Sequence, residues 1–250
     1  MMAQKIVTLI TGGEKGLGLK TAQALSKQGQ VIVIGALDTQ KAKAAVEAMT
    51  KAGNEASYVA LDVTNHAQVQ AAEQYLEDKY GYLTILINNA GIVTDAMKPS
   101  QEIPLAALHQ EFDVNFFGSV DVTQTMVPLL KKAEHAQIIN LSSNMGSLGL
   151  ATDPNFPFYN MTSLGYAASK AAINFETVSF SKDLKEFGIA VNSVNPGFTD
   201  TEFGGRNTND PKPAGMQTPD EGAAQIIKMA SQNPHPANAT FTENAGELPW

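Results

Sequence analysis

Short apolar runs of strand length alternate along the chain with segments whose apolar residues recur at helical spacing. Continuous apolar runs indicate strands that are buried on both faces. The pattern predicts seven strands, at residues 5–10, 31–34, 57–61, 83–88, 137–141, 190–194 and 239–241. Predicted helices separate them, at residues 16–28, 39–52, 65–80, 105–132, 163–187 and 219–231. We therefore predict one doubly wound, Rossmann-type α/β domain over residues 1–250, with a parallel sheet of about seven strands and helices on both faces.

Residues at several helix ends support this division. Thr64 is expected to cap the helix at 65–80, and Thr218, followed by Pro219, the helix at 219–231. Pro128 predicts a kink in the helix at 105–132 or its last turn. The loops richest in Pro, Gly and Asn follow predicted strands at the edge where doubly wound sheets bind ligands. These loops are residues 146–162 and 197–217.

Composition narrows the range of functions. The chain contains no cysteine, which excludes disulfides, thiolate metal sites and a cysteine nucleophile, and its four histidines lack metal-ligand spacing. A formal net charge of −8 argues against a nucleic-acid partner, since a phosphate-binding surface is basic. We see no signal segment and no apolar run as long as a membrane span. We therefore expect a cytoplasmic protein without a nucleic-acid or membrane partner.

A glycine-rich segment, TGGEKGLG at residues 11–18, joins the first predicted strand to the first predicted helix. Glycines at such a junction let the backbone approach a pyrophosphate, whose charge the helix N-terminus stabilises. The segment is not a P-loop, because Leu19 stands where the P-loop lysine is required. It also departs from the strict GxGxxG pattern, because Thr21 replaces the last glycine. A purely structural turn is the alternative.

Further motifs, in order along the chain, resemble those of the short-chain dehydrogenase/reductase family. After the glycine segment come Asn88-Asn89-Ala90-Gly91, Asn115 in a helix, Ser143-Asn144-Met145-Gly146, Tyr166 and Lys170 in a YxxxK motif, and Asn195-Pro196-Gly197 with Thr201. Each stands in the strand or helix context that the family requires. Residues 218–223, 240–241 and 246–250 are similar to the carbonyl-reductase-like branch of that family.

The resemblance implies reduction of a carbonyl group and a role for four residues. Tyr166 would act as the general acid, and Ser143 would donate a hydrogen bond to the substrate carbonyl. Lys170 would hold the nicotinamide ribose, and Asn115 would fix a water in a proton relay that ends at Lys170. Because Lys170 shares a helix face with Tyr166, we expect its ammonium group to lower the tyrosine pKa. Singly, each residue has a structural alternative: a core tyrosine, a solvated lysine, a turn-capping serine, and an asparagine bonded to backbone at a helix kink.

The resemblance also implies which residues contact the dinucleotide. They are Gly12, Lys15, Gly16, Leu17, Gly18, Leu37, Asp62, Val63, Asn89, Ala90, Gly91, Tyr166, Lys170, Pro196, Gly197, Thr199 and Thr201. Ala36 and Leu37 stand where family members carry the Asp or Arg that selects NAD or NADP, and Asp38 is assigned to the next helix cap. Lys15 matches the basic position that meets the 2′-phosphate in NADP-preferring members. NADPH is therefore the predicted cofactor, with NADH as the alternative.

The spacing from Ser143 to Tyr166 is longer than is usual for the family. The extra segment, residues 151–162, is either an apolar wall over the substrate or a surface insertion, and it leaves homodimer, homotetramer and monomer open. Trp250 is expected to reach the active site or a subunit contact. The segments expected to line the substrate pocket contain several large apolar side chains, which favour an apolar or aromatic carbonyl compound. These side chains are Met97, Met145, Met161, Phe203 and Met216.

We therefore predict an NADPH-dependent reductase that acts on a small ketone or aldehyde. Two alternatives use the same fold. One is an NAD-dependent alcohol dehydrogenase with the same site residues, and the other is a non-catalytic protein that senses a dinucleotide.

Overall fold

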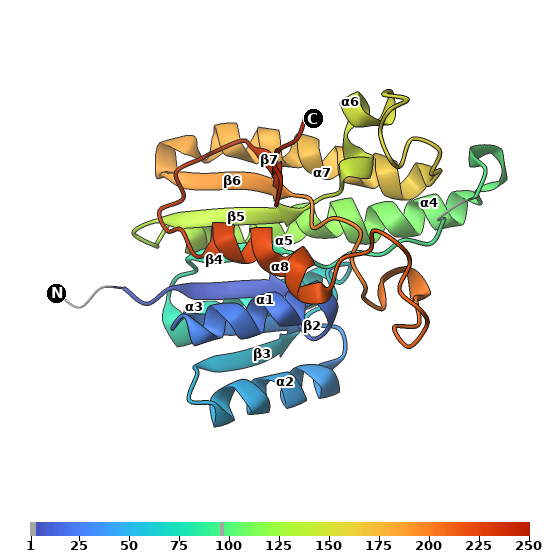
Figure 1. Ribbon diagram of the computed structural model, residues 1–250. Helices are drawn as coiled ribbons and strands as arrows, with labels where there is room; N and C mark the ends of the chain where they lie inside the picture. Colours follow the sequence, from blue (N-terminus) through green and yellow to red (C-terminus); the bar gives the residue numbers. More distant parts are fainter. Residues whose placement is uncertain (1–3, 96–97) are drawn as a thin grey trace.

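The computed structural model describes residues 4–95 and 98–250. Within them, one eight-stranded sheet has the order β3-β2-β1-β4-β5-β6-β7-β8, parallel throughout except between β7 and β8 (Figure 1). The order reverses between β1 and β4, where doubly wound sheets bind ligands, so the predicted fold class is confirmed. The strands are β1 (Val7–Thr11), β2 (Val31–Ala36), β3 (Ala56–Ala60), β4 (Ile85–Asn88), β5 (Ala136–Leu141), β6 (Ile189–Val194), β7 (Phe241–Glu243) and β8 (Gly246–Glu247).

Helices cover both faces of this sheet (Figure 1). Leu9 and Val33 belong to one hydrophobic cluster, whereas Ile10 and Ile34 belong to another, because successive strand side chains point to opposite faces. The strands therefore have continuous apolar runs because both of their faces are buried. One face is covered by α1 (Gly16–Lys27), α2 (Thr39–Lys51) and α8 (Pro219–Ala230), and the other by α3 (His66–Tyr80), α5 (Gly118–Leu130) and α7 (Leu164–Asp183). No helix in the described part of the chain is both long and apolar enough to cross a membrane.

The predicted helix at residues 105–132 consists of three segments. They are α4 (Leu105–Phe112), a π-helical turn at Asp113–Phe117, and α5, whose last turn contains Pro128 as predicted. A π-helical turn inserts one extra residue into a helix and is frequently found at functional sites. This turn contains Asn115.

Two of the predicted helix caps are confirmed and one is wrong. Asp38 caps α2, and Thr218 caps α8 in a capping box with Glu221. The residue that caps α3 is Asn65 rather than Thr64, since its side chain accepts the Gln68 N–H. Thr64 is unable to cap because its hydroxyl donates to the Asp62 carboxylate at 2.7 Å.

The C-terminal part of the chain returns to the sheet edge. The predicted strand at 239–241 lies two residues later as β7, and the short antiparallel β8 was not predicted. The Trp250 indole stacks on Phe241 with ring centroids 5.7 Å apart. Its backbone oxygen accepts a hydrogen bond from Gly149 in α6 (Leu148–Ala151), beside which the chain ends in Figure 1. Trp250 therefore packs on a strand of its own chain.

Candidate functional site

The glycine segment after β1 is shaped by close backbone contacts. Gly12 and Gly16 adopt the left-handed conformation, with φ of 63° and 52°. A Cβ at Gly18 would lie 2.5 Å from the Gly12 carbonyl oxygen and 2.6 Å from Asn89 Nδ2, so only glycine fits there. Asn89 Nδ2 also donates to the carbonyl oxygens of Thr11 and Gly12, at 2.8 and 3.0 Å. The loop after β4 therefore holds the glycine segment from the adjacent strand.

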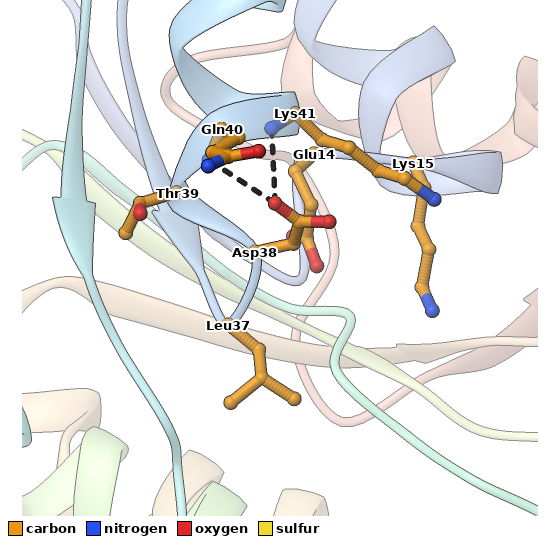
Figure 2. A pocket seen from close by; sticks show the side chains of 7 residues that line it. All are labelled: Glu14, Lys15, Leu37, Asp38, Thr39, Gln40 and Lys41. Carbon is orange, nitrogen blue, oxygen red and sulfur yellow. Dashed lines mark hydrogen bonds between the residues drawn. The ribbon is translucent and has the colours of Figure 1, made fainter.

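Next to this segment lies a pocket of about 400 Å³ between the glycine segment and the start of α2 (Figure 2). Asp38 is one of its lining residues, but its carboxylate accepts the Gln40 and Lys41 N–H groups, both at 3.1 Å, and serves as the helix cap. The side chains of Lys15 and Lys41 bring two ammonium groups to the pocket, and Glu14 brings a carboxylate. Sequence reasoning found Lys15 but missed Glu14 and Lys41, because only the folded chain places the first turn of α2 beside the glycine segment.

The predicted cofactor residues that follow β3 and β2 differ in their burial and in their hydrogen bonds. Asp62 follows β3 at the same sheet edge, but its carboxylate is bonded to the N–H and hydroxyl of Thr64. Val63 is buried and packs closely against Gly118 at the start of α5. Leu37 follows β2 with 73% of its side chain exposed, at the mouth of the pocket.

Ser143, Tyr166 and Lys170 are brought together at the carboxyl ends of β5 and β6. Tyr166 is half-buried in the first turn of α7, and Lys170 is buried one turn later. Lys170 Nζ lies 5.7 Å from the Tyr166 ring centroid and donates to the Leu141 carbonyl oxygen at 2.7 Å. Ser143 follows β5 two residues later, and its hydroxyl accepts the Met145 N–H at 3.2 Å.

The expectation that Lys170 lowers the Tyr166 pKa is wrong for this structure. Burial raises the pKa of Tyr166 to about 12, with Ser143 acting in the opposite direction and the charge of Glu111 adding to the increase. Burial also lowers the pKa of Lys170 to about 8. The physical reason is that the lysine ammonium group is itself buried and directed to the Leu141 carbonyl oxygen.

The glycine of the Ser-x-x-Gly motif is required by helix packing. A Cβ at Gly146 would lie 2.6 Å from the Lys170 carbonyl carbon and 2.8 Å from the Ala171 nitrogen. The turn that follows Ser143 therefore touches the backbone of α7 directly. Ser142 adds a hydrogen bond to the Lys170 carbonyl oxygen, at 3.2 Å. Together these contacts fix the distance between Ser143 and the Tyr166–Lys170 face of the helix.

The Asn115 side chain is bonded to the backbone, as the structural alternative for this residue predicts. Its Oδ1 accepts the Ile92 N–H at 2.8 Å, and its Nδ2 donates to the Ile92 carbonyl oxygen and to the Ser169 hydroxyl, both at 2.9 Å. A Cβ at Gly91 would meet Asn115 Oδ1 at 3.3 Å and Lys170 Nζ at 3.5 Å. The asparagine side chain therefore ties the loop after β4 to α7 beside Lys170.

The loop after β6 closes the site from the other side. Thr199 bonds to the Pro196 and Gly197 carbonyl oxygens, and the buried Thr201 side chain lies against Gly16 of the glycine segment. The predicted dinucleotide residues from this loop and from the glycine segment are therefore adjacent.

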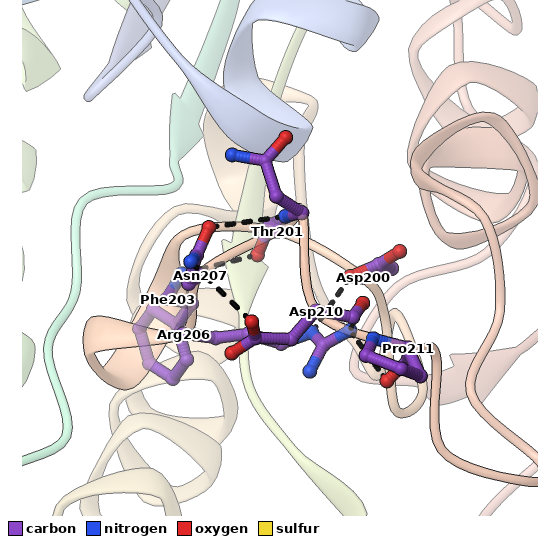
Figure 3. Close-up of polar contacts among 8 residues, drawn as sticks. Asp200, Thr201, Phe203, Arg206, Asn207, Asp210 and Pro211 are labelled. Atoms are coloured by element: carbon purple, nitrogen blue, oxygen red, sulfur yellow. Dashed lines mark hydrogen bonds and ion pairs between the residues drawn. The ribbon is translucent and has the colours of Figure 1, made fainter.

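The rest of this loop is braced by Arg206 (Figure 3). Arg206 Nε pairs with Asp200 at 2.7 Å, and Nη2 donates to the Asp210 and Pro211 carbonyl oxygens at 3.2 and 3.4 Å. Sequence reasoning missed this residue, although it is the only arginine in the chain. In the same loop, the Phe203 ring lies 5.8 Å from that of Tyr166.

The insertion contributes to the same region. The Phe158 ring lies 6.3 Å from the Phe198 ring and 5.5 Å from Phe156, both in edge-to-face arrangements. These contacts join the insertion to the loop after β6. Met97, predicted as a further pocket residue, lies outside the described residues.

Comparison with known proteins identifies the family. The fold and the glycine segment define a doubly wound α/β protein with a dinucleotide-type loop. The chain belongs to the short-chain dehydrogenase family of oxidoreductases, since the family model described as short chain dehydrogenase matches residues 6–212. It is 32% identical to the short-chain dehydrogenase anuI of Penicillium roqueforti, over 91% of this chain and 89% of that protein.

Two solved structures are similar over nearly the whole chain. The NADPH-bound carbonyl reductase from chicken fatty liver is 25% identical, with a TM-score of 0.84 and full coverage of both chains. The gluconate 5-dehydrogenase from Burkholderia cenocepacia, in complex with NADP and tartrate, is 29% identical, with a TM-score of 0.80 over 95% of this chain and 92% of that chain.

Proposed function

We propose that the protein reduces a ketone or aldehyde to an alcohol with NADPH, as a member of the carbonyl-reductase-like branch. The observation that carries the proposal is the convergence of Ser143, Tyr166 and Lys170 at the sheet edge that also carries the glycine segment. A non-catalytic dinucleotide-binding protein has no chemical need for all three. We further infer that residues 1–250 act as one domain, in which the insertion and the loop after β6 replace a separate substrate domain.

The residues at this edge fit a nicotinamide dinucleotide. The left-handed glycines and the start of α1 would receive the pyrophosphate, while Asn89, Ala90 and Gly91 would line the adenine ribose and Asp62 and Val63 the adenine. Thr199 and Thr201, from the loop next to the glycine segment, would hold the nicotinamide end. When bound, NADPH would supply the hydride, and the protein supplies position and proton transfer.

In the proposed mechanism Tyr166 Oη donates a proton to the carbonyl oxygen of the substrate. Its raised pKa keeps the hydroxyl protonated through neutral pH, which is the form that reduction requires. The Ser143 hydroxyl donates a hydrogen bond to the same oxygen and stabilises its developing charge. Lys170, with its pKa near 8, holds or releases a proton close to neutral pH and would restore the one that Tyr166 gives up. Asn115 holds the loop beside Lys170.

The substrate proposed for this site is an apolar or aromatic carbonyl compound. The Phe203 ring lies beside Tyr166, and the insertion and the loop after β6 add the aromatic pair Phe158 and Phe198. Arg206, the single arginine of the chain, is bonded to Asp200 and to backbone oxygens, so it offers no free charge to an anionic substrate.

Initial rates measured through the nicotinamide absorbance, with NADPH and NADH against a panel of ketones and aldehydes, test the proposal. We expect turnover of aromatic ketones or aldehydes with NADPH. Dinucleotide binding without turnover of any carbonyl or alcohol would favour the non-catalytic alternative.

Lys15 is expected to supply the preference for NADPH. Removing its ammonium group with Lys15→Ala should lower the NADPH/NADH ratio of kcat/KM by about tenfold, since an ion pair with the 2′-phosphate is lost. Lys41→Ala removes the second ammonium group of the pocket and should also lower the NADPH/NADH ratio of kcat/KM. Lys20→Ala is the matched control, because Lys20 pairs with Asp220 outside the pocket.

An unchanged ratio in Lys15→Ala would reject this assignment. Glu14 provides the opposite test, because its carboxylate lines the same pocket and is the one feature that favours the NAD-dependent alternative. Glu14→Gln should therefore raise the NADPH/NADH ratio.

A further inference from the structure

Two fully buried carboxyl groups near Tyr166 have no part in the mechanism above. Asp95 lies in the loop after β4, Glu111 lies on α4, and both side chains are 0% exposed. Buried carboxylates are costly unless donors surround them, so their partners indicate what they do. Both carboxyl groups lie against Gly165 in the first turn of α7.

Asp95 caps α7 from a different segment of the chain. Its Oδ2 accepts the Gly165 N–H at 2.6 Å, and its Oδ1 accepts the Ser163 hydroxyl. Ser163 occupies the N-cap position of α7, but its own side chain caps no N–H of the helix. A carboxylate at this point satisfies a first-turn N–H and interacts favourably with the helix dipole.

Glu111 fixes the segment that carries Asp95. Its Oε1 accepts the N–H groups of Thr94 and Asp95 and the hydroxyl of Thr94. Its Oε2 has no hydrogen-bond partner among the described residues and lies against Gly165, where any side chain would collide with it. The two carboxyl groups therefore enclose the backbone of the residue that precedes Tyr166.

The position of this contact matters because Tyr166 lies in the first turn of its helix. Helix ends fray when their first N–H groups lack partners. The chain enters α7 from residues 151–162, an insertion that is mostly exposed and made of turns. Without a cap from another segment, this entry gives the helix start little support.

We propose that Asp95 and Glu111 are positioning residues for the reaction. Asp95 holds the first turn of α7, and Glu111 holds Asp95, so that the Tyr166 hydroxyl stays next to Ser143. The expected effect on rate rests on the proposed reductase function. The claim that the two carboxyl groups hold Tyr166 in place does not depend on substrate or cofactor.

Kinetics of three variants test the effect on rate. Asp95→Ala should lower kcat by 10- to 100-fold, the effect expected of a misplaced catalytic group, while the KM for NADPH changes less than about twofold. Asp95→Asn should recover most of kcat, because its amide oxygen can still accept the Gly165 N–H. Asp183→Ala, at the opposite and exposed end of α7, is the matched control and should leave both constants unchanged. An unchanged kcat in Asp95→Ala, equal losses of kcat and NADPH binding, or an Asn variant as impaired as Ala would each overturn the proposal.

Crystal structures of the wild type and Asp95→Ala test the geometry without any turnover. We expect the Tyr166 hydroxyl of the variant to move away from Ser143 by about 1 Å or to occupy more than one position. An unmoved Tyr166 overturns the proposal whatever the kinetics show. If the wild type reduces no carbonyl compound, the proposed function fails, and the two structures still decide whether the carboxyl groups position Tyr166.

Discussion

Replacing Tyr166 with phenylalanine should lower kcat for carbonyl reduction by about a thousandfold, within the range that a general acid contributes. The variant loses only the hydroxyl that would give its proton to the substrate oxygen. The ring is retained, together with its contact to Phe203 at 5.8 Å. Dinucleotide affinity, measured by fluorescence titration, should therefore stay within about twofold, and the thermal unfolding midpoint should change by no more than a few degrees.

Tyr58→Phe is the matched control, since Tyr58 lies on β3 with its side chain partly exposed, away from the site. It should show wild-type kinetics. Turnover by Tyr166→Phe at a rate close to that of the wild type would remove Tyr166 from the mechanism. Loss of dinucleotide binding together with activity would mean that the hydroxyl acts in folding or binding instead.

The sheet was predictable from the sequence because its strands are buried on both faces. Residues 31–34, for example, form a continuous apolar run that is too short for a helix. The motif residues were predictable for a related reason. A parallel sheet collects the carboxyl ends of its strands at one edge, so Ser143 after β5 and Gly12 after β1 had to lie at the same edge, with β4 between their strands.

The features that could not be predicted from the sequence depend on contacts that form only in the folded chain. The π-helical turn around Asn115 continues the same apolar spacing as the helices on both sides, so periodicity could not separate it from them. Thr64 and Asn65 are both good caps, and the choice was decided by the Asp62 carboxylate, which engages Thr64. The direction of the Tyr166 pKa depended on burial, which outweighs the charge of a lysine directed elsewhere.

Another buried carboxyl group, that of Glu176, should make the stability of the protein pH-dependent. Glu176 lies on α7 and faces α5, where Oε1 accepts the Ser119 hydroxyl at 3.0 Å and that of Thr123 at 3.5 Å. Its Oε2 is buried with no hydrogen-bond partner among the described residues. Burial raises the pKa of Glu176 from 4.5 to about 8, while hydrogen bonds from Ser119 and Thr123 and the charge of Lys170 act in the opposite direction.

The sign of the effect follows from proton linkage. Because the folded protein holds the Glu176 proton more tightly than the unfolded chain, the free energy of unfolding falls as the pH rises from about 4.5 to about 8 and levels off above that. Between pH 6 and pH 8 the loss from this group should be about 2 kcal/mol. Glu176→Gln stays neutral, and its amide oxygen can still accept from Ser119 and Thr123. At pH 8 it should therefore be more stable than the wild type, by on the order of 4 kcal/mol.

Urea unfolding of both proteins at pH 6 and pH 8 measures this difference directly. The other titrating groups, including the histidines, are the same in the two proteins, so the change in their stability difference belongs to Glu176. Lys170 is coupled to Glu176 through its charge, but its own lowered pKa of about 8 alters stability mainly above this range. Glu186→Gln is the matched control, since Glu186 is exposed in the turn after α7. An equal pH dependence in wild type and Glu176→Gln would show that Glu176 is already ionised in the folded protein, with its charge compensated by its neighbours.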